Sequence, residues 1–294
     1  MTEPNLASAE PADATWPDAK YPGTNTLLQG PTGSGKTHVI RTLLDAGLEV
    51  FCLFTEPMGM EILSDTDPDQ LHWAYVPPAA PSWDAMLDNA KKINTMNFED
   101  LTKLKAGISK RDYNQFNKLL QKCANFVCDR TGKEYGAVDE WDNHRAVVLD
   151  SLSGINIMVM DMTVGSKPVK SPGEWQVAMD VEERLINKLC SDTRCFFVLT
   201  AHQFRDTDEV YGGISVQAQA LGRKLAPRIP RFFSDVVYVY REAGKFLWST
   251  DTPNMELKAR NLPIDVGLTP GFKQIVDVWK SRYGKGTSTS KRVV

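Results

Sequence analysis

Residues 27–47 read LLQGPTGSGKTHVIRTLLDAG, and the middle of this stretch decides the fold. Residues 30–37, GPTGSGKT, match the pattern G-x-x-x-x-G-K-[S/T], in which backbone N–H groups and a lysine surround phosphate groups. The apolar residues before the pattern predict a buried strand, and those after it predict a helix that ends at Gly47. Because the motif requires this strand–loop–helix order, the sequence predicts a phosphate-binding loop here.

The loop predicts a nucleoside triphosphate site with a magnesium ion. Lys36 is expected to reach the β- and γ-phosphates, and Thr37 to hold Mg²⁺. The expected cofactors are therefore ATP and Mg²⁺. The expected nucleotide-binding residues are Gly30, Pro31, Thr32, Gly33, Ser34, Gly35, Lys36, Thr37 and His38. For His38, a place on the surface of the following helix is the simpler expectation.

Composition limits the class of protein. The 294 residues carry 34 Lys and Arg against 37 Asp and Glu, a net charge of −3, and 42% of them are hydrophobic. This is the balance of a globular protein, and the net charge does not by itself favour nucleic acid. No signal peptide is evident, no apolar run reaches the about 20 residues of a membrane helix, and the five cysteines form no C-x-x-C pair. A cytoplasmic protein with reduced cysteines and no membrane partner is expected.

Buried strands alternate with helices over most of the chain. The predicted strands lie at 24–30, 48–57, 71–78, 145–154 and 194–203. A helix over 176–190 carries Val177, Val181, Leu185 and Leu189 one turn apart. Strands that are apolar on both faces predict an α/β fold, with a mainly parallel sheet covered by helices on both sides. Residues 235–250 predict a C-terminal antiparallel hairpin that turns at Ala243-Gly244, and 255–260 can add another strand.

Four segments follow from this pattern. Residues 1–22 are expected to be a flexible lead-in, 23–280 the folded domain, and 281–294 a disordered basic tail. A helical insertion is expected at about 84–136, with an apolar stripe of Phe116, Leu119, Leu120, Cys123 and Val127. The simpler interpretation of the insertion is a solvated cover packed on the core, and the alternative is a surface for a partner or nucleic acid.

Polar side chains follow three of the predicted strands, at the edge where the phosphate loop lies. Asp150 ends one strand and is expected to hold the Mg²⁺ water shell. Glu56 follows another and is the expected base for the attacking water, with Glu61 as its rival. Gln203 and His202 end a third strand, and Gln203 is the preferred sensor of the γ-phosphate.

This order of features resembles the RecA-like recombinase and helicase core, and more narrowly the RecA-core ATPases of tailed bacteriophages, over roughly residues 20–282. The resemblance implies a RecA-like ATPase domain with Glu56 as catalytic glutamate, Asp150 as metal-site acid and Gln203 as the coupling glutamine. It also implies that Lys258 and Arg260 reach the γ-phosphate of a neighbouring subunit. A homo-oligomer, either ring or filament, is therefore expected, in the host cytoplasm if the chain is phage-encoded.

The resemblance also implies two loops that bind single-stranded DNA, at about 161–175 and 204–222. The basic residues expected to contact DNA are Lys167, Lys170, Arg205, Arg223 and Lys224. Trp175 can either stack on a base or pack in the core. The chain lacks the N-terminal polymerisation helix and C-terminal DNA-gathering domain of bacterial RecA, and 206–209 carry three acids. These departures weaken the case for strand exchange more than the case for ATP hydrolysis.

The expected function is thus a Mg²⁺-dependent ATPase that binds single-stranded DNA in recombination, annealing or replication. Single-strand-binding or replication proteins are possible partners. Two alternatives remain open at the level of sequence. One is a P-loop kinase acting on a small molecule, and the other is a slow nucleotide switch or scaffold that recruits a partner through residues 84–136.

Overall fold

The computed structural model describes residues 16–18, 20–57, 59–103, 113–165, 167, 169–207 and 212–284. The central strands are β1 (Asn25–Gln29), β2 (Glu49–Phe54), β3 (Leu71–Tyr75), β4 (Arg145–Asp150), β5 (Phe196–Ala201), β8 (Asp235–Glu242), β9 (Lys245–Ser249) and β10 (Lys258–Ala259). Their order in the sheet is β10-β8-β1-β5-β4-β2-β3, with β9 paired to β8. The six strands from β8 to β3 are parallel, while β9 and β10 run antiparallel to β8.

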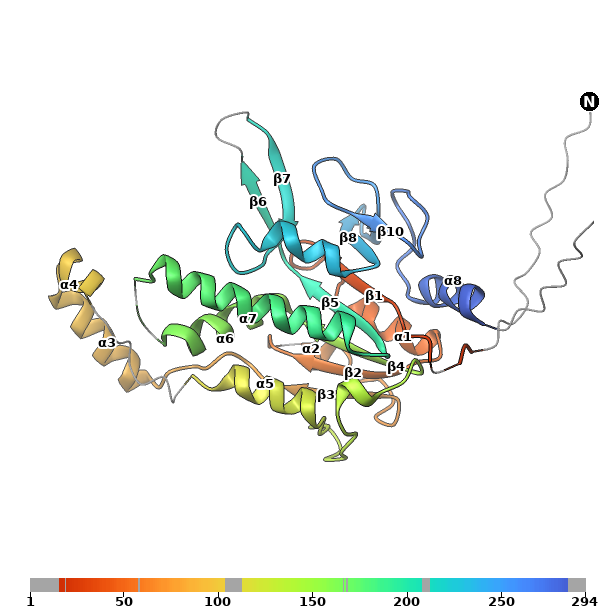
Figure 1. Ribbon diagram of the computed structural model, residues 1–294, viewed down its shortest axis with the longest axis horizontal. Helices are drawn as coiled ribbons and strands as arrows, with labels where there is room; N and C mark the ends of the chain where they lie inside the picture. The colour runs from red at the N-terminus through yellow and green to blue at the C-terminus, as the bar shows by residue number, and fades with distance from the viewer. Residues whose placement is uncertain are drawn as a thin grey trace, which may run out of the picture.

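Helices cover both faces of this sheet (Figure 1). One face carries α5 (Gln115–Ala124), α6 (Leu152–Val164) and α7 (Pro172–Ser191), and the other carries η1 (His38–Arg41), α1 (Thr42–Asp45) and α8 (Lys273–Tyr283). The remaining helical segments are α2 (Gly59–Ile62), α3 (Trp83–Thr95), α4 (Phe98–Lys103), η3 (Val138–Glu140) and η4 (Ala226–Phe232). The predicted three-layer α/β architecture is confirmed.

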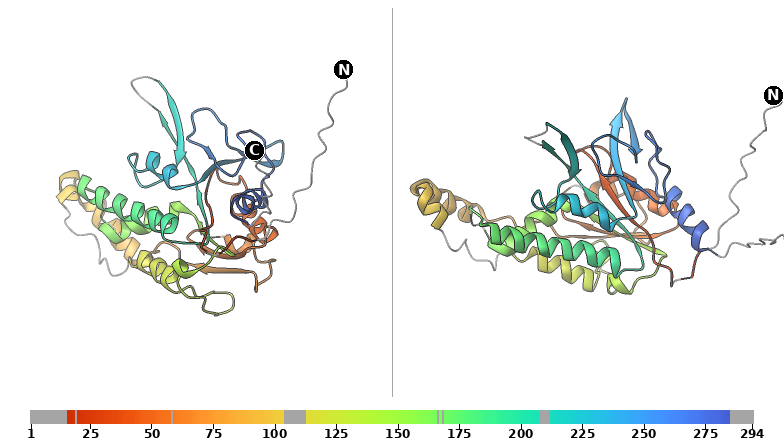
Figure 2. Two further views of the ribbon diagram at one scale, coloured as in Figure 1. Left: turned by 45° about the vertical axis from the view of Figure 1, so that its right-hand side comes forward. Right: turned by 45° about the horizontal axis from the view of Figure 1, so that its top comes forward.

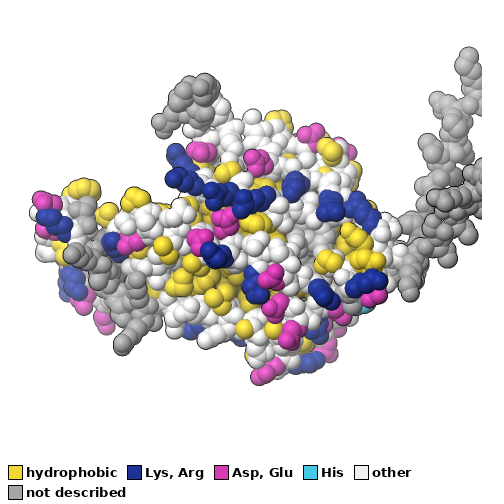
Figure 3. Space-filling model, in the orientation of Figure 1, with side chains coloured by type: hydrophobic (Ala, Val, Ile, Leu, Met, Phe, Trp, Pro, Cys, Tyr) yellow, Lys and Arg dark blue, Asp and Glu magenta, His cyan; other side chains and the backbone are white. Residues whose placement is uncertain are grey.

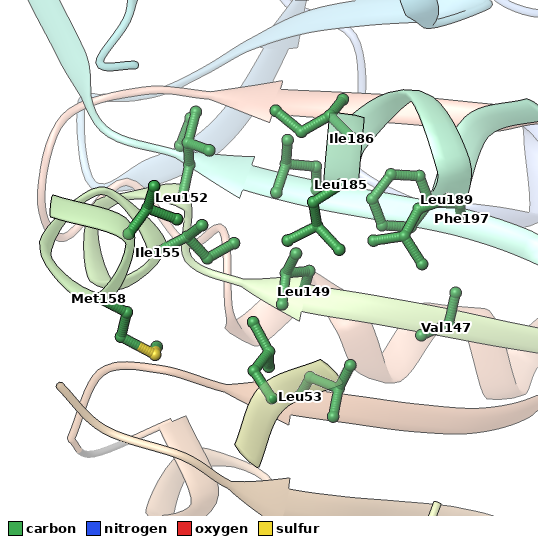
Figure 4. Close-up of a cluster of buried hydrophobic side chains, with 14 of the residues drawn as sticks. Leu53, Val147, Leu149, Leu152, Ile155, Met158, Leu185, Ile186, Leu189 and Phe197 are labelled. Atoms are coloured by element: carbon green, nitrogen blue, oxygen red, sulfur yellow. The ribbon is translucent and has the colours of Figure 1, made fainter. Parts of the chain in front are cut away.

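Alternation along the strands divides the core into two layers. In β4, Val147 and Leu149 point to the layer beneath α6 and α7, while Ala146 and Val148 point to the layer beneath α1 and α8. Figure 4 shows the first layer, in which Leu149 meets side chains of both helices. All four side chains are fully buried, and a buried Val or Leu stabilises the fold by about 1.5–3 kcal/mol. Truncation of Leu149 to Ala should therefore cost about 2–5 kcal/mol.

The predicted hairpin and strands are confirmed, and the first helix is shorter and tighter than expected. Ala243 and Gly244 both have positive φ, 47° and 81°, as a two-residue hairpin turn requires. The segment after the phosphate loop begins as the 3₁₀ turn η1 before the four residues of α1. In α7, Leu185 and Leu189 are buried as predicted, but Val177 is 55% exposed because the α7 N-terminus extends beyond the core.

The insertion is partly core and partly a projecting arm. In α5, Phe116 and Leu119 are buried beside α6, whereas Leu120 is 41% exposed. The helices α3 and α4 project from the body of the molecule (Figures 1 and 2), and α3 has no buried residue. The insertion is therefore neither wholly solvated nor wholly packed.

A two-stranded antiparallel sheet replaces the loop expected at 204–222. Strands β6 (Gln203–Thr207) and β7 (Ile214–Ala218) pair from Gln203 opposite Ala218 to Thr207 opposite Ile214. This hairpin projects from the molecule in both further views (Figure 2). The segment expected as a loop at 161–175 is also largely helical, since α6 runs to Val164 and α7 begins at Pro172.

One carboxyl group is buried between α7 and the segment after β7. Glu182 has no exposed surface, and one of its oxygens accepts a hydrogen bond from the Leu221 N–H at 3.3 Å. The other oxygen has no hydrogen-bond partner within the described part of the chain. Burial raises the pKa of Glu182 to about 8, because an apolar environment disfavours the charged form.

The two ends of the described chain meet on one side of the sheet. The ring of Trp16 lies 6.2 Å from that of Trp279, and the Lys280 ammonium lies 3.8 Å above the Trp16 ring. Tyr21 contacts Tyr283 in the same way. The rest of the expected lead-in, 1–15, and residues 285–294 of the expected tail lie outside the described residues. Among the described helices, none is both long and apolar enough to cross a bilayer.

Candidate functional site

A cleft of about 360 Å³ lies at the carboxyl ends of β1, β2, β4 and β5. Its lining comes from the phosphate loop, from the residues that follow the other three strands and from the β8–β9 hairpin. The lining residues are Thr32, Gly33, Ser34, Gly35, Lys36, Thr37, His38, Glu56, Ile62, Asp150, His202 and Phe246. The sheet topology thus brings together groups that are up to 214 residues apart, counting from Thr32 to Phe246.

Two glycines show why the loop sequence is needed. Gly30 lies against β8, where a Cβ atom would come within 2.1 Å of the Val239 carbonyl oxygen. Gly35 has φ +93°, a conformation that favours glycine, and a Cβ there would meet the Phe246 ring at 2.8 Å. Side chains at either position would push the loop away from the hairpin that covers it.

The ammonium of Lys36 is held inside the loop. It donates hydrogen bonds of 2.9 Å to the carbonyl oxygens of Gly30 and Pro31, and the residue is only 6% exposed. Burial lowers the pKa of Lys36, and the nearby carboxylates of Asp150 and Glu56 partly offset this effect. Gly30 and Pro31, expected as nucleotide contacts, lie outside the cleft lining and bind this lysine instead.

Asp150 and Thr37 form the oxygen-rich corner of the cleft. The Thr37 hydroxyl donates to Oδ2 of Asp150, and the Thr200 hydroxyl donates to Oδ1. Burial raises the pKa of Asp150, while the hydrogen bonds from Thr200 and Thr37 act in the opposite direction. A hydroxyl and a carboxylate 2.7 Å apart are hard oxygen ligands of the kind that Mg²⁺ prefers. The predicted metal residues are therefore adjacent, and their chemistry fits the ion.

Glu56 follows β2 and lines the cleft beside Ser151 and His202. One of its oxygens accepts a hydrogen bond from the Ser151 hydroxyl, and the other lies 3.4 Å from Nε2 of His202. The hydrogen bond with His202 lowers the pKa of Glu56 despite partial burial. Its rival Glu61 is exposed on α2 and does not line the cleft.

His202, rather than Gln203, reaches the cleft. The His202 ring joins two walls, since Nδ1 lies 3.5 Å from the Thr32 hydroxyl and Nε2 faces Glu56. Gln203 begins β6, and its amide donates to the sulfur of Met255 at 3.8 Å. The Gln219 N–H donates to the His202 carbonyl at 2.8 Å, so β6 and the residue after β7 both meet at His202.

Phe246 is a residue of the cleft that sequence reasoning missed, whereas His38 was among the expected nucleotide-binding residues. Phe246, at the start of β9, packs on Gly35, and its ring centroid lies 6.1 Å from that of His38. His38 therefore lines the cleft instead of occupying a plain helix surface. A signal for Phe246 existed, because an aromatic residue stands two positions after the predicted turn at 243–244.

The basic pair near the C-terminus lies at the other end of the sheet. Lys258 pairs with Val236, near the first residue of β8, and β8 runs parallel to β1. The Lys258 ammonium donates to the carbonyl oxygens of Phe233 at 2.7 Å and Pro230 at 3.3 Å. The Arg260 backbone N–H donates to Asp235, and its side chain is exposed. Within one chain, neither side chain reaches the cleft.

The basic residues expected to meet DNA fall into two groups. Arg205, Arg223 and Lys224 are exposed at the hairpin and just after it, where Arg223 lies 3.6 Å from Asp206. Figure 3 shows Lys and Arg side chains gathered over the region of η4. Lys167, in contrast, is only 13% exposed and pairs with Glu174 at 2.7 Å, at the start of α7. Lys170 is partly buried nearby, and Trp175 is 37% exposed.

No protein-family model and no curated protein matches the chain. Similar solved structures include an ATPase from the type III secretion system of pathogenic bacteria, with 11% identity and a TM-score of 0.38, over 75% of this chain and 53% of that one. Another is the RadB recombinase, with 12% identity and a TM-score of 0.32, over 80% of this chain and 84% of that one. The chain spans about half the length of the secretion ATPase.

The strand order and the phosphate loop together define an α/β fold with a phosphate-binding loop at the carboxyl edge of a mainly parallel sheet. The loop follows β1, Asp150 ends β4, and β5 lies between these two strands. The mainly parallel sheet, its helices on both faces and the antiparallel β9 and β10 agree with this fold.

Proposed function

We propose that the protein is a Mg²⁺-dependent ATPase that hydrolyses ATP in the cleft of the phosphate loop. The observation that carries the proposal is the convergence of Lys36, the Thr37–Asp150 pair and Glu56 on one cleft. The lysine and the loop N–H groups would hold the phosphates, and the Thr37 and Asp150 oxygens would hold Mg²⁺. When bound, the ion would neutralise charge that develops on the phosphate oxygens.

Glu56 is the proposed base. A water molecule attacks the γ-phosphorus, its proton passes to the Glu56 carboxylate, and the bond to the bridging oxygen breaks to release ADP and phosphate. The Ser151 and His202 contacts orient the carboxylate, and the lowered pKa of Glu56 keeps it in the ionised form that a base requires. Lys36, held by two carbonyls at 2.9 Å, would exchange these for phosphate oxygens.

We further propose that the protein acts on single-stranded DNA in recombination, annealing or replication, as the likeness to phage RecA-core ATPases implies. The exposed Arg205, Arg223 and Lys224 at the β6–β7 hairpin support this role. The hairpin is joined to the cleft through His202. The pairing of Lys167 with Glu174 makes that lysine a poorer DNA contact than the three residues of the hairpin region.

The test is an ATPase assay that measures both free phosphate and phosphorylated products. We expect Mg²⁺-dependent release of phosphate, stimulated by single-stranded DNA more than by duplex DNA or RNA, and no activity in Lys36→Ala. A phosphorylated small molecule in place of free phosphate would establish a kinase instead. Tight ATP binding with negligible turnover under every condition would indicate a nucleotide switch.

A further inference from the structure

A second cavity of about 470 Å³ adjoins the phosphate cleft. The two share Ser34, Gly35, His38 and Phe246, so these residues lie where the two cavities meet. The walls of the second cavity are mainly apolar and come from the start of the first helix, the β8–β9 hairpin and the segment before α8. They include Val39, Leu247, Trp248, Thr269 and Pro270.

The direction of a bound triphosphate follows from the positions of the reactive groups. Glu56, Asp150 and His202 line only the phosphate cleft, and they mark the end where the γ-phosphate must lie. The loop N–H groups hold the α- and β-phosphates. A nucleotide placed this way leaves the loop on the side of Gly35 and His38, where the second cavity begins.

The walls of this cavity suit a flat aromatic ring. Phe246 is 39% exposed although it is a large apolar side chain, and it stacks with His38 at an interplanar angle of 29°. The indole N–H of Trp248 is buried and has no acceptor within the described part of the chain. The Thr42 hydroxyl is engaged, since it donates to the Val39 carbonyl and accepts from the Phe272 N–H. The other polar side chains of the wall are those of Ser34, His38, Lys245 and Thr269, and the last three are exposed to solvent.

On the basis of the proposed nucleotide-binding function, we propose that this cavity is the nucleobase subsite and that Phe246 is its principal determinant. The base is held by stacking and apolar contact with Phe246 and the cavity wall, and its edges are read weakly. Both ATP and GTP are therefore substrates of the site, whereas a triphosphate without a base lacks this part of the binding free energy.

The experiment compares the affinities of Mg-ATP, Mg-GTP and Mg-tripolyphosphate by calorimetry. Tripolyphosphate occupies the loop but has no base. In wild type, ATP should bind at least about tenfold more tightly than tripolyphosphate, since one base–aromatic contact accounts for a change of this size. Phe246→Ala should weaken ATP binding about tenfold and leave tripolyphosphate unchanged, and Phe246→Tyr should restore ATP binding because it keeps the ring. The matched control is Phe98→Ala, which removes a 76% exposed phenylalanine on the projecting arm.

Three results would contradict the assignment of this cavity as the nucleobase subsite. Equal losses for ATP and tripolyphosphate in Phe246→Ala would show that the ring merely supports the loop at Gly35. An unchanged ATP affinity in that variant would place the base elsewhere. A preference of more than about a hundredfold for ATP over GTP would require edge recognition that these walls do not supply. If wild type binds neither ATP nor tripolyphosphate, the proposed function itself fails, and the subsite with it.

Discussion

The hydroxyl of Thr37 and the carboxylate of Asp150 are joined by a 2.7 Å hydrogen bond across 113 residues of sequence. The bond fixes the phosphate loop to the end of β4, although β5 lies between β1 and β4 in the sheet. Thr200 at the end of β5 donates to the other oxygen of the same carboxylate. One acid therefore ties together three strand ends around the proposed metal site.

Removal of either metal-site oxygen should uncouple nucleotide binding from magnesium. In Thr37→Val and Asp150→Asn, we expect Mg²⁺ to lose most of its effect on ATP affinity, with turnover at least about tenfold lower. Thr200→Val removes only a hydrogen bond to Asp150 and should have a smaller effect. Titration of ATP affinity against Mg²⁺ concentration measures this, and a normal Mg²⁺ response in Asp150→Asn would exclude Asp150 from the metal site.

Glu56→Gln should bind ATP normally and hydrolyse it about 10²–10⁴ times more slowly, because the amide cannot accept the proton of the attacking water. Glu61→Gln is the matched control, since Glu61 is the neighbouring acid outside the cleft, and it should keep full activity. Single-turnover hydrolysis and equilibrium binding separate the two effects. Normal hydrolysis by Glu56→Gln would show that another group activates the water.

Glu182 should make the protein less stable as the pH rises. Its folded-state pKa of about 8 exceeds the ordinary 4.5, so between these values the folded chain holds a proton that the unfolded chain releases. The free energy of unfolding should then fall by at most about 1.4 kcal/mol per pH unit, mainly between pH 4.5 and 8. Glu182→Gln should remove this slope and be the more stable protein at pH 8.

Urea unfolding at several pH values tests the role of Glu182. The control is Glu183→Gln, because this neighbour on α7 instead pairs with Arg228 and Arg231 at the surface. It should lower stability by at most about 1 kcal/mol and leave the pH slope intact. The same pH slope in wild type and Glu182→Gln would show that the buried carboxyl does not hold a proton in this range.

Arg223 and Lys224 should contribute to DNA affinity through counterion release. Reversal of both charges to Glu should weaken binding of single-stranded DNA and reduce the slope of log affinity against log salt by about 1.4 or more. Reversal of Lys118 and Lys273, two exposed lysines on α5 and α8, should have little effect. Fluorescence anisotropy at several salt concentrations gives both quantities. Salt-independent binding by wild type would contradict an electrostatic DNA surface.

Lys258 and Arg260 should behave differently from each other. Lys258→Ala should lower the melting temperature, because the ammonium bonds to carbonyls at the end of η4. Arg260→Ala should fold and bind ATP but hydrolyse poorly if its exposed side chain serves a neighbouring subunit, where such a residue adds about 10³-fold or more. Mixing Arg260→Ala with Lys36→Ala protein should then restore activity. A fully active monomer, or no rescue in mixed oligomers, would leave Arg260 without this role.

The sequence predicted those parts of the site that depend on local pattern. The phosphate loop, the Asp150 strand end and the turn at 243–244 each have a short-range signal, and the structure confirms their positions. The choice between His202 and Gln203 had no such signal. Two successive residues at a strand end point in different directions, and only the surrounding fold decides which one faces the cleft.

Long-range pairing explains the other differences. Lys167 is predicted from the sequence to contact DNA, but in the structure it binds Glu174. Glu174 also belongs to the capping box that Ser171 begins at the start of α7. The pattern Ser-Pro-Gly-Glu over 171–174 is a readable helix start, so part of this contact was predictable. The pairing of β6 with β7 was harder to predict. A shift of one strand by two residues against the other keeps each side chain on the same face, so in a polar hairpin it changes little burial.

Both ends of the β6–β7 hairpin meet at His202, through the peptide bond to Gln203 and the hydrogen bond from Gln219. His202 is therefore the point at which both strands are connected to the cleft. A displacement of β6 and β7 that turns the His202 backbone would also turn its imidazole ring. The contacts of that ring with Thr32 and Glu56 would then change. Contacts made along β6 and β7 and the position of the Glu56 carboxylate in the cleft are thus linked through His202.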